Sequence, residues 1–209
     1  MTRCFLGFEL TDEGRAHLEE RVPPFHARLA KAEGWDVRLV LPENWHATLL
    51  FFQDLSGGER ELVWAAVEEA VGGGAWIAMG FPWQGLALWP NPRRPNLICL
   101  EAPAHPPARD WPIQKLLGNA PFDKGEVHHL QSYRPHITLM RFRRGREGRS
   151  PRAIAREWAA LGAEIPSIDP ECIRFDRISF FLSTLSRQQP VYPRERTLAL
   201  GIKPWENDK

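Results

Sequence analysis

Runs of β-prone residues alternate with helical runs along the chain, and Gly, Pro and Asn turns separate them. The first half reads strand, helix, strand, strand, helix, strand, and the second half repeats this order less cleanly. This order predicts an α+β fold whose antiparallel-rich sheets carry their helices on the outer face. The expected strands cover residues 3–10, 37–41, 45–52, 76–81, 85–89, 96–101, 133–142, 172–182 and 197–202.

The helical runs carry recognisable start and stop signals. Thr11 can cap the first helix, which we expect the Pro-Pro pair at 23–24 to break or restart. Ser56 and Glu59 fit a capping box ahead of the second helix, which a run of three glycines ends. Two further helices are expected at about 107–117 and 151–161.

A His-x-Thr-Leu pattern occurs twice, with the two histidines 90 residues apart. Each copy lies in a strand-like run, where side chains alternate between faces. His46 and Thr48 therefore face the same way, as do His136 and Thr138, while the apolar residues between them face the core. Because the pattern is duplicated, we expect two equivalent units that bring the two pairs together.

No low-complexity linker separates the two halves of the sequence. We therefore expect one domain, residues 1–209, with two closely packed and pseudo-twofold lobes. Each lobe would hold one sheet, and the two His-x-Thr pairs would lie in the cleft between the uncovered sheet faces.

Composition is that of an ordinary globular protein with a sizeable core, since 43% of the 209 residues are hydrophobic. The three cysteines are far apart, so we expect neither a disulfide framework nor a CxxC motif. No apolar run is long enough to span a bilayer and no signal peptide opens the chain, so we expect a cytoplasmic monomer without a membrane partner. Among the 27 basic residues 22 are Arg, which reflects genome composition or heat adaptation, or else supplies forked donors for phosphate.

Two histidines on opposite sides of a substrate can act as general base and general acid in one turnover, because the pKa of imidazole lies near neutrality. A Thr hydroxyl beside each ring can donate a hydrogen bond to a non-bridging oxygen. The four side chains therefore suit an in-line displacement at phosphorus. The competing interpretation is a pair of hydrogen-bonded structural histidines.

With these flanks, the chain resembles the two-histidine phosphoesterases, and among them the bacterial and archaeal RNA 2′,3′-cyclic phosphodiesterases, once described as 2′-5′ RNA ligases. The resemblance covers most of the chain. It rests on residues 3–10, 44–49, 89–95, 134–141 and 183–185, and on Tyr192.

The resemblance implies a bilobal fold, no metal or other cofactor, and hydrolysis of a 2′,3′-cyclic phosphate on an RNA end or small nucleotide to a 2′-phosphate. It makes His46 and His136 the acid–base pair, with Thr48 and Thr138 as phosphate ligands. We assign His46 as the acid on the ribose oxygen and His136 as the base on water, and the symmetry of the motif leaves the reverse assignment open. Arg141 matches a basic position that binds phosphate in many members. RNA ligation at the same site and a non-catalytic nucleotide- or RNA-binding module stay open as alternatives.

Four further features have less certain roles. Phe8 is a candidate for stacking on a base, and Gly7 stands where the family commonly has a small Ala. The pair His128-His129 lacks metal-ligand spacing, which favours a loop role. A basic stretch either contacts an RNA backbone or is a solvated face. Its members are Arg143, Arg144, Arg146, Arg149 and Arg152.

Overall fold

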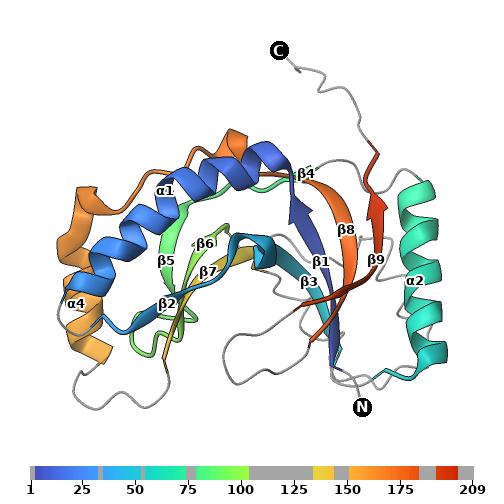
Figure 1. Cartoon of the computed structure of the whole chain (residues 1–209), viewed down its shortest axis with the longest axis horizontal. Coiled ribbons are helices and arrows are strands. Elements are labelled where there is room, and N and C mark those ends of the chain that lie inside the picture. The colour runs from blue at the N-terminus through green and yellow to red at the C-terminus, as the bar shows by residue number, and fades with distance from the viewer. Residues whose placement is uncertain are drawn as a thin grey trace.

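The structure is a computed structural model that describes residues 3–32, 35–52, 55–73, 79–103, 134–143, 151–183 and 192–201. These residues form an α+β fold, as the sequence pattern predicts (Figure 1). The α-helices are α1 (Asp12–Lys31), α2 (Gly57–Gly72) and α4 (Pro151–Leu161). Short 3-10 helices cover Pro42–Asn44, Gly162–Glu164 and Pro170–Cys172.

The strands of the described ranges join in one sheet of nine, and every pairing in it is antiparallel. They are β1 (Cys4–Leu10), β2 (Val37–Leu39), β3 (His46–Phe52), β4 (Met79–Gly80), β5 (Gly85–Trp89), β6 (Leu97–Glu101), β7 (His136–Phe142), β8 (Arg174–Leu182) and β9 (Arg194–Ala199). The main order is β4-β8-β1-β3-β7-β6-β5, with β2 added to β7 and β9 to β8.

The two motif strands, β3 and β7, are neighbours at the centre of this order. One half of the sheet is built outward from β3 and the other from β7. The two halves, expected as separate sheets, are joined where Ala47 pairs with Ile137. Both of these residues are fully buried, so the join is part of the core. The fold therefore brings the two copies of the motif together where these two neighbouring strands pair.

Helix α1 runs through the Pro-Pro pair without a break, contrary to the expectation from sequence. A proline removes the hydrogen bond to the carbonyl four residues earlier. Those carbonyls belong to Glu19 and Glu20, which are exposed, so water can satisfy them. On the opposite face, buried apolar side chains hold the helix on both sides of the pair. They are Leu18, Val22, Phe25 and Leu29.

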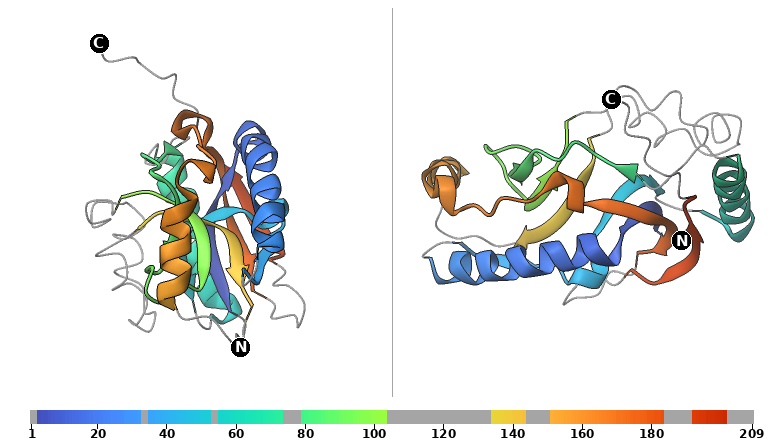
Figure 2. Two further views of the ribbon diagram at one scale, coloured as in Figure 1. Left: turned by 90° about the vertical axis from the view of Figure 1, so that its left-hand side faces the viewer. Right: turned by 90° about the horizontal axis from the view of Figure 1, so that it is seen from above.

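The other helices lie at opposite ends of the molecule, as Figures 1 and 2 show. α2 begins with the expected capping box of Ser56 and Glu59 and lies near β9, whose Arg196 stacks on Trp64 of α2. α4 lies at the far end of α1, where Trp158 packs edge-on against Phe25. None of the described helices has the length and apolar character of a membrane span.

Several expected elements differ or fall outside the described ranges. The last strand is Arg194–Ala199, a few residues earlier than the expected 197–202. The expected helix at 107–117 and the pair His128-His129 lie outside the described residues, as does the first half of the expected strand at 76–81.

Candidate active site

Each motif strand begins at its histidine and carries the predicted alternation. In β3, His46 and Thr48 are partly exposed, whereas Ala47 is buried. β7 repeats the same sequence of exposure from His136 onward. The interpretation that each His and Thr share one face, with core residues between them, is therefore confirmed by the burial pattern.

The register between the two strands places each histidine near the threonine of the other copy. Ala47 lies opposite Ile137, and antiparallel partners run in opposite directions. One step along in each direction, His46 faces Thr138 and Thr48 faces His136. The positive charge of a protonated His136 lowers the pKa of His46, in keeping with this short separation. The register thus brings the two His-x-Thr pairs side by side on one face of the sheet.

Both rings are oriented by the backbone carbonyl two residues earlier. Nδ1 of His46 lies 2.7 Å from the carbonyl oxygen of Asn44, and Nδ1 of His136 lies 3.1 Å from that of Arg134. A carbonyl oxygen only accepts, so Nδ1 must donate and therefore carries the hydrogen in both rings. In the neutral ring this leaves Nε2 unprotonated and able to take a proton. Nε2 of His46 lies 3.1 Å from Oγ1 of Thr48.

An aromatic ring stacks against each histidine. Phe5 of β1 lies 4.7 Å from His46 between ring centroids, at an interplanar angle of 27°, and Trp89 of β5 lies 4.4 Å from His136 at 20°. The prediction that Phe8 stacks on a base is wrong, because its side chain is fully buried and unavailable to a ligand. β1 is buried along its whole length, so its sequence does not show which residues face the site.

Arg141 shares the face of His136 because β7 contains a bulge. Cys99 pairs with Thr138 while Ile98 pairs with Met140, so Leu139 has no counterpart on β6. An extra residue reverses the alternation of the strand beyond it. As a result, Arg141 lines one pocket together with His46 and Thr138, as well as Tyr192 and the β2 residue Arg38. The sequence analysis missed Arg38.

The first strand pair contains the matching irregularity. Leu6 pairs with Leu50 and Gly7 with Thr48, so Leu49 is the extra residue on β3. The bulge falls three residues after the histidine in both copies. The duplication seen in the motif therefore extends to the shape of the two strands.

Burial is the main cause that lowers the pKa of both histidines. The pKa of His46 falls from 6.5 to about 4, because burial and the positive charges of His136 and Arg141 outweigh the Asn44 carbonyl, which favours the charged ring. The pKa of His136 is lowered by burial and by the charges of Arg141 and Arg134. At neutral pH the site therefore holds two neutral rings, and a neutral ring can accept a proton and act as a general base. An acid needs an anion to raise the pKa of one ring.

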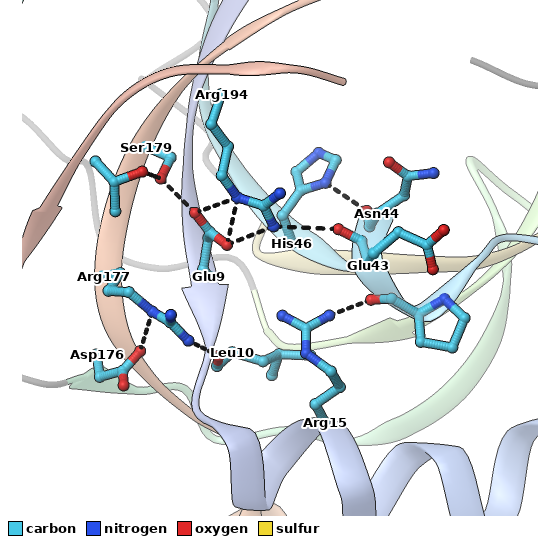
Figure 3. A network of polar contacts seen from close by, with 12 residues as sticks. Glu9, Leu10, Arg15, Glu43, Asn44, His46, Asp176, Arg177, Ser179 and Arg194 are labelled. Carbon is cyan, nitrogen blue, oxygen red and sulfur yellow. Dashed lines mark hydrogen bonds and ion pairs between the residues drawn. The ribbon is translucent and has the colours of Figure 1, made fainter. Parts of the chain in front are cut away.

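A buried carboxylate lies beside His46 in the sheet (Figure 3). Glu9 pairs directly with His46 across β1 and β3 and is 2% exposed. Nη2 of Arg194 donates to it at 2.7 Å, and Ser179 Oγ also donates to it. Arg194 further donates to the carbonyl of Glu43 at 3.3 Å, next to the residue that orients His46.

Glu9 stays charged in this environment. Burial alone would raise its pKa, but the hydrogen bonds from Arg194 and Ser179 lower it by more. The negative charge favours protonation of His46. The sequence analysis did not single out this group, although a Glu inside the apolar run at 4–10 was a visible signal.

The remaining candidates are not part of this constellation. Arg143 forms an ion pair with Asp36 at 3.4 Å and Arg152 is exposed, while Arg144, Arg146 and Arg149 lie outside the described residues. Among the described side chains, no three of His, Cys, Asp or Glu are grouped so as to hold a metal ion.

The fold is that of solved LigT structures, a likeness that extends over almost the whole chain. The structure matches E. coli LigT complexed with 3′-AMP with a TM-score of 0.56 and 18% identity, over 96% of this chain and 98% of that one. It also matches TT0787 of Thermus thermophilus with a TM-score of 0.57 and 20% identity, over 97% of this chain and 100% of that one.

A sequence relative points in the same direction. The chain is 27% identical over 190 residues to the RNA 2′,3′-cyclic phosphodiesterase of Methanothermobacter thermautotrophicus, covering 91% of this chain and 94% of that protein. No protein-family model matches the chain. The resemblance to the two-histidine phosphoesterases that the motifs indicate is thereby confirmed.

Proposed function

We propose that this protein hydrolyses the 2′,3′-cyclic phosphate of an RNA end or a small nucleotide to a 2′-phosphate. The observation that carries the proposal is the matched pair His46 and His136, each with its hydrogen on Nδ1 and an unprotonated Nε2, on the two strands that pair at Ala47 and Ile137. The whole-length similarity to a protein named RNA 2′,3′-cyclic phosphodiesterase supports the same activity.

One ring acts as base and the other as acid. Nε2 of the base takes a proton from water as the water oxygen bonds to phosphorus. The bond from phosphorus to the ribose 3′ oxygen breaks, and the acid gives its proton to that oxygen. The product carries one phosphate on the 2′ oxygen, so atoms and charges balance. After turnover the base releases its proton to solvent and the acid takes one up, which restores both rings for the next cycle.

Thr48 and Thr138 would hold the non-bridging oxygens through their hydroxyls. Arg141 would balance the negative charge that builds up on these oxygens. Because both halves of the site belong to one chain, a single-domain monomer is expected to be sufficient.

The acid must be a charged imidazolium, although burial keeps both rings neutral at pH 7. The anionic phosphate raises the pKa of a ring that it approaches, because an opposite charge favours the charged form. We keep His46 as the acid and His136 as the base, with Glu9 favouring the charged form of His46.

The test is turnover of an oligonucleotide that ends in a 2′,3′-cyclic phosphate, measured in the presence of EDTA. We expect turnover by the wild type and a loss of at least about 100-fold in either His46→Ala or His136→Ala, as for removal of a general acid or base. His17→Ala is the control, because His17 is remote from the site and bonds the backbone of Asp169. Full activity in either site variant would contradict the assignment.

The same experiment separates the two alternatives. A labelled RNA that grows in length, instead of only losing its cyclic end, would indicate ligation. Saturable binding of the oligonucleotide with no product after long incubation would indicate a binding module.

A further inference from the structure

Two arginines face each other across β2 and β7. Arg38 and Arg141 are direct partners in the antiparallel register, so their side chains leave the sheet on the same face. Both line the pocket that also contains His46 and Thr138. A single Arg would suffice to balance the charge of one reacting phosphate, and the pocket has a second.

The charge of this pocket is one-sided. Its described lining residues include two arginines and no carboxylate. The neighbouring pocket beside Glu9 differs, since its lining includes four acidic residues along with three arginines. Like charges placed directly opposite each other in a sheet destabilise it, and an anion between them relieves the repulsion. The described lining of the pocket with Arg38 and Arg141 is therefore more basic than that of its neighbour.

The position of the pair relative to the motif suggests which anion it binds. The reacting phosphorus would lie between the histidine Nε2 atoms and the threonines. Arg141 is three residues beyond Thr138 on β7. Arg38 lies opposite Arg141 on β2, the strand that pairs with this part of β7. The arginine pair thus extends the site along β7, away from the crossing with β3, in the direction in which a longer substrate could continue.

We propose that Arg38, together with Arg141, binds a second phosphate of the substrate, the one on the 5′ oxygen of the terminal nucleotide. This rests on the proposed function and narrows it, because the preferred substrate is then an RNA end instead of a nucleoside cyclic phosphate. Charge-assisted hydrogen bonds from Arg to phosphate are strong and geometrically specific, so the preference should be measurable.

Three substrates isolate the contribution of this phosphate. They are adenosine 2′,3′-cyclic phosphate, the same compound with a 5′-phosphate, and the dinucleotide ApA ending in a 2′,3′-cyclic phosphate. For the wild type, kcat/KM should be about tenfold or more higher for the last two, as expected for a charged hydrogen bond. The advantage should decrease with added salt, because it depends on charge.

Arg38→Gln should remove this advantage, so that kcat/KM for the two substrates with a 5′-phosphate falls toward the value for adenosine 2′,3′-cyclic phosphate. Arg38→Lys should retain part of the advantage, because it keeps the charge and loses the fork. Arg28→Gln is the matched control, since Arg28 is an exposed arginine of α1 that pairs with Glu164. Thermal unfolding of each variant separates loss of the fold from loss of the contact.

Three results would overturn the proposal. The first is an equal loss on all three substrates in Arg38→Gln, and the second is an advantage confined to the dinucleotide, which would assign it to the second nucleoside. Equal turnover of all three by the wild type would likewise refute the second phosphate site and leave the proposed function intact. No turnover of any of them by the wild type would refute the proposed function itself.

Discussion

The hydrogen bond from His46 Nδ1 to the Asn44 carbonyl fixes the ring without fixing its charge, since Nδ1 is protonated in both charge states. Burial decides the charge and makes the ring neutral in the folded protein. In the unfolded chain, the same histidine has an ordinary pKa near 6.5. This difference links the site to the stability of the whole protein.

The protein should therefore lose stability as the pH falls. Between pH 6.5 and 4 the unfolded state binds a proton at His46 that the folded state does not, so the free energy of unfolding decreases with decreasing pH. From pH 7 to pH 5 this one group should cost about 1–2 kcal/mol. Urea unfolding at the two pH values would measure the loss.

The matched variant is His46→Gln, which cannot titrate in this range. Its loss of stability from pH 7 to pH 5 should be smaller than that of the wild type by about the same 1–2 kcal/mol. An identical pH dependence in both proteins would show that His46 is not the group responsible.

Removing the carboxylate of Glu9 should affect both stability and the pH profile. Glu9→Gln weakens its hydrogen bonds with Arg194 and Ser179, at an expected cost of about 1–3 kcal/mol, moderated because Arg194 is partly exposed and can be hydrated. The pKa of His46 should fall further, since the negative charge that favours protonation is gone.

The pH dependence of turnover separates an effect of Glu9 on His46 from an effect of Glu9 on the stability of the protein. In Glu9→Gln, the pH limb that reports protonation of His46 should shift to lower pH. Arg194→Met serves as the companion variant, and a double-mutant cycle gives the coupling between the two residues. An unchanged pH profile in a folded Glu9→Gln would contradict a role for Glu9 at His46.

At the scale of elements, the bulges decide which side chains reach the site. Arg141 stands five residues after His136, and an odd separation on a regular strand would put the two on opposite faces. The family resemblance identified Arg141, but the alternation alone would have excluded it. Bulges depend on the pairing of two strands, so the sequence of one strand does not reveal them.

The close approach of β1 to β3 can be tested at Gly7. A Cβ at this position would lie 3.3 Å from each of three atoms: the Ala47 carbonyl oxygen, His46 Cδ2 and Phe181 Cε2. Gly7→Val adds a branched side chain against the His46 ring, and we expect at least about tenfold lower kcat through its displacement. Turnover kinetics and thermal unfolding would measure the two effects.

Gly58→Ala is the control for this substitution. Gly58 is in the first turn of α2, where a Cβ would meet no atom within 4 Å. We expect unchanged turnover and equal or higher stability there, because Ala favours the helix. A Gly7→Val protein with normal kcat would show that the ring tolerates displacement.

At the scale of the molecule, the join between Ala47 and Ile137 sets the separation of the two histidines. Ile137→Ala should cost about 2–5 kcal/mol of unfolding free energy, as for other buried large-to-small substitutions. It should also lower kcat per folded molecule, because a shift of the two strands at this join changes the separation of the two rings.

The control is Ile178→Ala in β8, at a residue that is also fully buried but not in the join. Its cost in stability should be similar, whereas kcat per folded molecule should stay near that of the wild type. Urea unfolding and active-site-normalised turnover distinguish the two. Equal kcat in both variants would contradict a special role for the join.

Much of the molecular plan could be predicted from sequence, because it rests on local patterns. The alternation around His46 and His136, the capping box at Ser56 and the order of elements all have short-range causes. Glu9 and Arg38 were missed because their significance depends on partners far along the chain. The continuity of the sheet was missed for the same reason, since one pair of residues joins its halves.

The matched bulges also bear on the direction in which a substrate can lie. With two equivalent histidines alone, a substrate could bind in either of two opposite directions. Five residues after the histidine, however, the second half carries Arg141 and the first carries Phe51, which is 36% exposed and pairs with Phe5. One end of this strand face is therefore cationic and the other aromatic, and under the proposed function this inequality would give a bound RNA strand a single direction.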